Sequence, residues 1–172
     1  MVWKDKGLAE ILAKLKRAGE IAGGVGVYGE KAEEPHPLRQ NITVGEVAII
    51  NEYGSKRAHV PRRSFLKSTF DGNRENIRVK MASGVHRIVE GQITPEQMFH
   101  EIGSKIADAV KETIRRGDVP PENDPATIKD KGHDNTLVHT GTLERAIDHT
   151  IVRREGNVLV NAGKLPEVLE GD

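Results

Sequence analysis

The sequence predicts an α+β fold in which a small antiparallel sheet packs against several helices and two long loops leave the packed core. Apolar residues at helical spacing, most clearly over residues 95–116, indicate the helices. Segments rich in β-branched residues, one at 21–28 and two after residue 146, indicate the strands. With 172 residues, of which 36% are hydrophobic, we expect a single domain. The polar residues 162–172 are expected to be a mobile tail of that domain.

The first predicted elements are a helix over residues 5–18 and a strand over 21–28. Apolar residues at helical spacing predict the helix: Leu8, Ile11, Leu12 and Leu15. The strand contains Gly24–Gly29, which match the pattern G-x-G-x-x-G. A dinucleotide site needs a helix directly after those glycines, but an acidic segment broken by two prolines follows. The sequence therefore argues against nucleotide binding, and residues 29–42 are predicted to be an exposed loop.

A short helix and a cationic loop are predicted next. Thr43 is a suitable N-cap with Glu46 completing a capping box, and Gly54 is suited to ending the helix. The loop 55–67 contains five cations and no acid: Lys56, Arg57, Arg62, Arg63 and Lys67. Pro61 favours an extended loop over a helix. Such a loop suits contact with a partner better than it suits catalysis.

The middle of the chain is predicted to contain two long helices. Phe65, Leu66 and Phe70 are expected to begin one helix, which continues through residues 73–89. The other starts at Pro95, with Thr94 as N-cap, and ends near residue 116.

A polar connection over 118–140 follows, with three prolines and no clear structure. The chain then ends in a helical turn at Thr142–Ala146 and two strands, 147–154 and 158–162, joined by a tight turn.

Composition excludes several classes of function. The net charge is zero and aromatic residues make up 3%, so the chain has neither a global basic footprint nor a stacking platform for nucleic acid. It has no cysteine, which excludes disulfides and thiolate chemistry. No apolar run approaches the length of a membrane span, and the N-terminus lacks the apolar segment of a signal peptide. We expect a soluble protein that is made and used inside a cell, without a membrane partner.

Catalytic and metal-binding patterns are weak. His100-Glu101 opens like H-E-x-x-H, but Ser104 occupies the position of the second ligand. His133, Asp134 and His139 can converge on a metal, or they can be ordinary exposed loop residues. The sequence contains no G-x-S-x-G motif and no phosphate-binding P-loop. We therefore expect no enzyme and no cofactor, and an enzyme with 118–140 as a lid remains an alternative.

Two blocks of sequence resemble a known family. The first is Glu52-Tyr53-Gly54, a short polar loop, and Val60-Pro61-x-Arg63-x-Phe65-Leu66. The second is Pro120-Pro121, Pro125-Ala-Thr-Ile-x-x-Lys131-Gly132 and Leu137-Val-x-Thr140-Gly141-x-Leu143. In this order they are similar to the tail-completion or head–tail joining (neck) proteins of long-tailed bacteriophages, also described as minor tail or virion morphogenesis proteins. The resemblance spans roughly residues 43–150. Ser64 and His139 depart from it, because the family often has proline and aspartate there.

The resemblance implies a structural virion protein that forms a ring, often a hexamer, at the neck or tail end. Such a ring completes the tail or joins it to the head, is assembled in the host cytoplasm, and contacts neighbouring neck, connector and tail-tube proteins. DNA passes through it without sequence-specific binding. The residues expected to contact a neighbouring subunit or ring are Glu52, Tyr53, Lys56, Arg57, Arg62, Arg63 and Phe65.

On this hypothesis, reversing Arg62 and Arg63 to glutamate spares folding and blocks assembly. A DNA-binding accessory protein that uses the basic loop 55–67 is the alternative. It predicts steeply salt-dependent duplex binding by the monomer, and the zero net charge argues against it.

Overall fold

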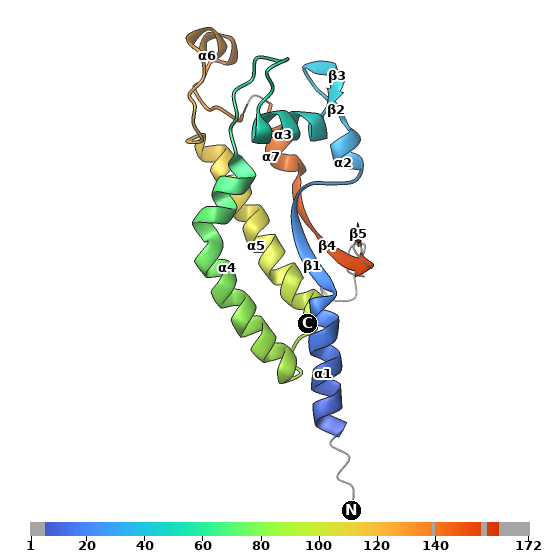
Figure 1. The fold of residues 1–172 in the computed structure, drawn as a ribbon. Helices are drawn as coiled ribbons and strands as arrows, with labels where there is room; N and C mark the ends of the chain where they lie inside the picture. Colours follow the sequence, from blue (N-terminus) through green and yellow to red (C-terminus); the bar gives the residue numbers. More distant parts are fainter. Residues whose placement is uncertain (1–5, 139, 156–157, 162–172) are drawn as a thin grey trace, which may run out of the picture. The chain divides into compact units, whose positions relative to one another are not determined.

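The structure, a computed structural model, describes residues 6–138, 140–155 and 158–161 and has the predicted α+β class (Figure 1). The tail 162–172 lies outside the described residues. The helices are α1 (Lys6–Gly19), α2 (Glu30–Glu33), α3 (Val44–Tyr53), α4 (Phe65–Val89), α5 (Pro95–Arg116), α6 (Pro125–Lys131) and α7 (Thr142–Ala146). The strands are β1 (Ile21–Val27), β2 (Pro35–His36), β3 (Arg39–Thr43), β4 (Ile147–Glu155) and β5 (Val158–Asn161).

The strands form two small sheets. One has the strand order β1-β4-β5, and β4 and β5 pair antiparallel from Val152 opposite Asn161 to Glu155 opposite Val158. The other is the antiparallel pair of β2 and β3. The three strands predicted from β-branched segments are therefore confirmed.

The chain divides into two compact units, each built from separate segments. Unit 1 comprises the described residues of Met1–Gly24, Glu75–Ser104 and His149–Asp172, and unit 2 comprises those of Val25–Arg74 and Lys105–Asp148. The helices α4 and α5 and the strands β1 and β4 contribute residues to both units. The expectation of a single domain stays a prediction.

Unit 1 is held together by apolar contacts and ion pairs between helices. Ile88 of α4 and Met98 of α5 are buried, and a Cβ atom at Gly84 would overlap the Met98 side chain, so the two helices approach closely there. Arg17 of α1 pairs with Glu96 of α5 at 2.6 Å.

The environment of Glu96 shifts its pKa in two directions. Burial by itself raises this pKa, but hydrogen bonds from the backbone and from Arg17 outweigh burial and hold it below the ordinary value of 4.5.

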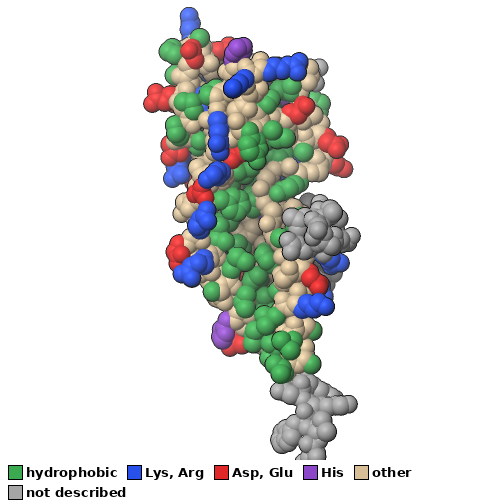
Figure 2. All heavy atoms as spheres, viewed as in Figure 1, with side chains coloured by type: hydrophobic (Ala, Val, Ile, Leu, Met, Phe, Trp, Pro, Cys, Tyr) green, Lys and Arg blue, Asp and Glu red, His purple; other side chains and the backbone are tan. Residues whose placement is uncertain are grey.

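The surface of unit 1 retains apolar and histidine side chains. Leu8 and Leu12 of α1 are 55% and 57% exposed, and hydrophobic side chains are visible over α1 in Figure 2. His100 and His149 share one hydrogen bond of 2.8 Å between Nδ1 and Nε2, and Gly103 lies against the His149 ring.

Unit 2 has a core formed where the first half of α4 lies against the second half of α5. Phe65, Val110 and Ile114 are fully buried in it. Beside them, the Thr69 and Thr113 hydroxyl groups hydrogen-bond at 2.8 Å. Both hydroxyls also contact the carbonyl oxygen four residues earlier in their own helix, at Phe65 and Ala109. A polar contact in this core is thereby satisfied on both helices.

Both predicted capping boxes are present. The Thr43 hydroxyl accepts the backbone N–H of Glu46 at 3.2 Å, and the Glu46 carboxylate accepts that of Thr43 at 2.8 Å. Thr94 and Gln97 make the same reciprocal pair at 3.2 and 2.7 Å. α4 is one helix of 25 residues that begins at Phe65, as the apolar residues predicted.

Two segments predicted to lack regular structure contain some. The prediction of a loop over 29–42 is wrong, because α2 and the β2–β3 hairpin occupy it, and the Glu34 carbonyl bonds the first N–H of α3 at 2.9 Å. The connection 118–140 contains α6, which Asp124 caps by accepting the Ala126 N–H at 2.8 Å and Gly132 ends in the left-handed conformation.

Candidate interaction surface

The cationic segment after α3 folds into a compact turn rather than an extended loop. Ser55 and Val60 form an isolated antiparallel bridge, with N–H···O distances of 2.8 and 3.0 Å. The Ser55 hydroxyl also accepts the Ala58 N–H at 3.1 Å. Gly54 has φ 76°, and a Cβ atom there would lie 2.9 Å from the Arg62 nitrogen, so the entry to the turn requires glycine.

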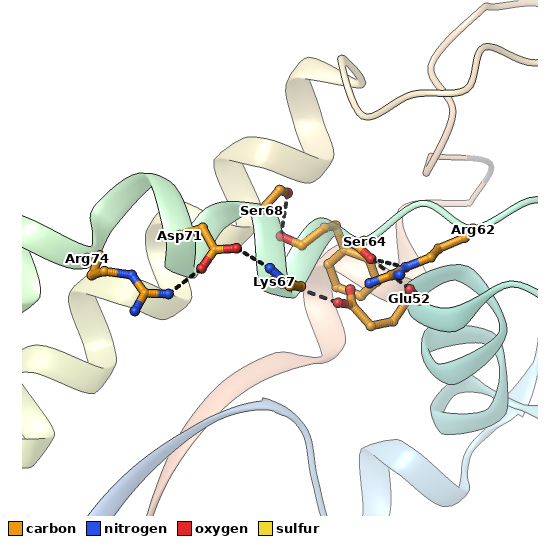
Figure 3. A network of polar contacts seen from close by, with 8 residues as sticks. Glu52, Arg62, Ser64, Lys67, Ser68, Asp71 and Arg74 are labelled. Atoms are coloured by element: carbon orange, nitrogen blue, oxygen red, sulfur yellow. Dashed lines mark hydrogen bonds and ion pairs between the residues drawn. The ribbon is translucent and has the colours of Figure 1, made fainter.

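Glu52, one of the predicted contact residues, caps α4 instead. Its side chain is 5% exposed, and its two oxygens accept the backbone N–H groups of Leu66 and Lys67 at 2.8 and 3.1 Å (Figure 3). These are two of the N–H groups that have no partner within the first turn of a helix. A residue of α3 therefore supplies the negative charge that stabilises the N-terminus of α4.

Two hydrogen bonds connect the Glu52 backbone, through Ser64, to Arg62 at the surface. The Ser64 hydroxyl donates to the Glu52 carbonyl at 3.0 Å and accepts from Nε of Arg62 at 2.6 Å. Figure 3 shows Arg62, Ser64 and Glu52 side by side at the start of α4. Serine at position 64, where the resembled family often has proline, thus orients Arg62.

Arg63 is also buried, at 7% exposed, and ties the turn to the connection before α6. Its Nε donates to the Pro121 carbonyl at 2.9 Å. Its Nη2 donates to the Glu122 carbonyl and to Oδ1 of Asn123, both at 3.2 Å. Burial lowers the pKa of Arg63.

Asn123 extends this link along the chain. Its Nδ2 donates to the Asp134 and Asn135 carbonyls at 2.9 and 3.0 Å. Arg63 therefore holds the start of the segment that contains α6, and Asn123 links that start to its end.

Three of the seven predicted contact residues are largely buried within the folded chain. Phe65 is fully buried in the core of unit 2, and Glu52 and Arg63 are buried by the bonds described above. These side chains hold the turn in place. Their charge and size predicted surface contacts, because residue type alone does not show on which side of the backbone a side chain lies.

The other four predicted residues are exposed and lie close together. Tyr53 is 71% exposed, and it lines a shallow hollow of about 670 Å³ together with Lys56 and Arg62. Arg57 is exposed in the same turn. Ile49, one helical turn before Tyr53 on α3, is 60% exposed and was missed, although its spacing of four residues from Tyr53 indicates a shared face. Below, the interaction surface means Ile49, Tyr53, Lys56, Arg57 and Arg62.

The cations of this surface are not neutralised by the chain itself. Within the described residues, Lys56, Arg57 and Arg62 make no ion pair with an acid. Lys67 differs, because it pairs with Asp71, which also binds Arg74 at 2.7 Å. Three of the five predicted cations therefore remain available to a partner.

The alternative metal site is only partly described. Nδ1 of His133 is buried without a hydrogen-bond partner in the described part of the chain, and the Asp134 carbonyl bonds Asn123. His139 lies outside the described residues. Over the ranges that the structure describes, no three potential ligands of a metal ion come together.

Comparisons with protein-family models, with curated proteins and with solved structures give no match. Among the described helices, none combines the length and the apolar character needed to cross a bilayer. The role of the chain must therefore be inferred from its residues and their geometry.

Proposed function

We propose that this chain is a structural virion protein of a long-tailed bacteriophage, which forms a ring at the neck or tail end and completes the tail or joins it to the head. The observation that carries the proposal is the interaction surface itself: an apolar centre of Ile49 and Tyr53, bordered by three cations without acidic partners. The two blocks that resemble neck proteins support the assignment, and the first block contains Tyr53 and the turn.

The composition of this surface suits a protein–protein contact. Interface centres are enriched in tyrosine and arginine and are surrounded by polar rims. An acidic partner would pair with Lys56, Arg57 and Arg62. Each exposed ion pair contributes only about 0–1 kcal/mol. Repetition around a ring raises the total, since each further contact forms at high effective concentration.

The residues that hold the turn in place favour binding in a second way. Glu52, Arg63 and Ser64 fix the turn by hydrogen bonds before any partner arrives. Ordering a flexible loop on binding costs free energy, which a loop already held in place avoids. The surface is thereby preorganised for contact with the next subunit or with a neighbouring neck, connector or tail-tube protein.

The DNA-binding alternative gains less from this geometry. If three cations contact phosphates, the logarithm of the affinity is expected to fall with the logarithm of salt concentration with a slope of about −2.7, whereas five cations would give about −4.5. Burial of Arg63 and pairing of Lys67 remove two of the five. DNA that only passes through a ring would need no tighter binding than these three cations can provide.

The test is a charge reversal confined to the exposed cations. The double variant Lys56→Glu/Arg62→Glu is expected to fold as the unchanged protein does but to form no rings. A control of equal charge change is Lys105→Glu/Lys129→Glu, at two exposed lysines of unit 2 outside the surface. Light scattering at low and high concentration, with negative-stain imaging, measures the assembly.

Rings from the unchanged protein and the control, but not from the surface variant, would support the proposal. Rings from both variants would contradict the role of this surface. A chain that stays monomeric at all concentrations but binds duplex DNA with a salt slope near −2.7 would favour the DNA-binding alternative.

Arg63 must be left out of this test. We predict that reversal of Arg63, unlike reversal of Arg62, does not spare folding, because a glutamate there would face three oxygen atoms of residues 121–123. Losing the hydrogen bonds of a charged group and leaving their acceptors unpaired is expected to cost about 3 kcal/mol or more. Loss of assembly in an Arg63 variant would therefore report on folding.

A further inference from the structure

Unit 2 contains a second hollow, with a volume of about 640 Å³, which shares His59, Val60 and Pro61 with the hollow beside the interaction surface. It lies between α3, residues 58–61 of the turn and the described residues of 122–137 and 140–143. Its size falls within the range of ligand-binding clefts, roughly 300–1,000 Å³. Aliphatic side chains form part of its wall: Ile42, Val47, Ile50, Val60, Leu137 and Leu143.

Two cations line this cleft without acidic partners. Within the described residues, neither Arg63 nor Lys131 forms an ion pair. Arg63 uses Nε and Nη2 for the acceptors of residues 121–123, and no described atom accepts a hydrogen bond from its Nη1. Arg63 is 7% exposed and lines the cleft, so part of its side chain reaches the hollow. Lys131 donates to the Asn135 carbonyl at 3.3 Å, which leaves two of its three hydrogens.

The two charges influence one another. Burial lowers the pKa of Lys131, and the positive charge of Arg63 lowers it further. Partly dehydrated like charges raise the free energy of the folded chain, and an anion placed between them would reduce that cost. The folded chain therefore holds two donors that favour a negatively charged ligand.

The surroundings restrict which anion fits. Glu122 and Asp124 also line the cleft, and they would repel a phosphate dianion more strongly than a single carboxylate. A small ion would leave the aliphatic wall of the cleft exposed to water. In a peptide, the apolar side chains next to an acidic residue can cover that wall.

We propose that this cleft binds a carboxylate between Nη1 of Arg63 and Nζ of Lys131, carried by an acidic peptide segment whose neighbouring aliphatic side chains contact the apolar wall. This inference goes beyond the ring proposal, because the site contains none of the residues of the interaction surface and does not depend on ring formation.

The test uses the full chain and short peptides of the form Ac-X-Glu-X-NH2, in which X is Leu, Val or Ile, with matched peptides that carry Gln in place of Glu. Calorimetry measures affinity, and NMR measures the pKa of Lys131.

We expect the Glu peptides to bind and to raise this pKa. Lys131→Gln is expected to weaken binding about tenfold or more, because it removes a charged hydrogen bond. Lys131→Arg, which keeps the charge, should restore most of it, and Lys105→Gln, which lies outside the cleft, should leave it unchanged.

Acetate and inorganic phosphate serve as free anions at matched ionic strength. If acetate raises the Lys131 pKa while no peptide binds, the cleft binds a carboxylate, but the proposal that a peptide carries this carboxylate is overturned. Equal binding of Glu and Gln peptides, or phosphate binding tighter than every carboxylate, would overturn the carboxylate assignment. Unchanged affinity in a folded Lys131→Gln variant would overturn the site itself.

Discussion

Replacing Glu52 with glutamine is expected to destabilise unit 2 through the first turn of α4. The carboxylate is 5% exposed and accepts two backbone N–H groups, those of Leu66 and Lys67. Glutamine has nearly the same shape, but only one of its two terminal atoms can accept a hydrogen bond. One of the two N–H groups would then face an amide donor.

The expected loss follows from two contributions. Leaving one buried N–H without a partner costs about 1–3 kcal/mol. Removing a negative charge from the N-terminus of a helix costs about 0.3–1 kcal/mol, and up to about 2 when the site is partly buried. We expect a decrease in the free energy of unfolding of about 3 kcal/mol, which for a chain of this length lowers Tm by about 10 °C.

Urea unfolding followed by circular dichroism measures the free energy, and amide hydrogen exchange locates the effect. Exchange should accelerate at Leu66 and Lys67 relative to the middle of α4. Glu33→Gln is the matched control, because Glu33 is exposed in the same unit. An exposed substitution of this kind is expected to change stability by about 0.5 kcal/mol or less.

Equal stability of the Glu52→Gln and Glu33→Gln variants would refute the capping role of Glu52. So would a large loss of stability that leaves hydrogen exchange at Leu66 and Lys67 unchanged, because the damage would then lie elsewhere.

Two further predictions concern the other polar contacts between helices. Thr69→Val and Thr113→Val are each expected to cost about 1 kcal/mol, and the double variant less than their sum, because the hydroxyls bond one another; additive losses in a urea double-mutant cycle would contradict this coupling. Glu96→Gln is expected to flatten the acid dependence of stability. The folded chain holds the Glu96 pKa below 4.5, so the contribution of Glu96 to stability is present above pH 4.5 and is lost as the pH falls below it. If the unfolding midpoints of the variant and of the unchanged protein depend on pH in the same way from pH 7 to 3, this role of Glu96 is contradicted.

Helix ends could be predicted from the sequence because their signals are local. Thr43 and Thr94 each find their capping partner three residues later, and the structure contains both reciprocal pairs. Such pairs need no other part of the chain. The start of α4 at Phe65 followed in the same way from apolar residues within one or two turns.

Short elements were harder to predict. β2 has two residues and α2 has four, too few for a periodic pattern to appear. α6 was missed although Asp124, Pro125 and Gly132 are local helix signals, because the surrounding prolines favoured a loop. Elements of this length depend on contacts with their neighbours, such as the bond from the Glu34 carbonyl to α3.

The sequence by itself determined that residues 52–67 combine one acid, the aromatic residues Tyr53 and Phe65, and five cations in a segment between two helices. Only the tertiary structure decided which of them face solvent. Arg62 and Arg63 are adjacent and chemically identical, yet Arg62 is exposed and Arg63 bonds acceptors that lie 58 to 60 positions further along the chain. The physical reason is that a guanidinium group can be buried only where several oxygen atoms surround it, and the fold collects those atoms from a distant segment.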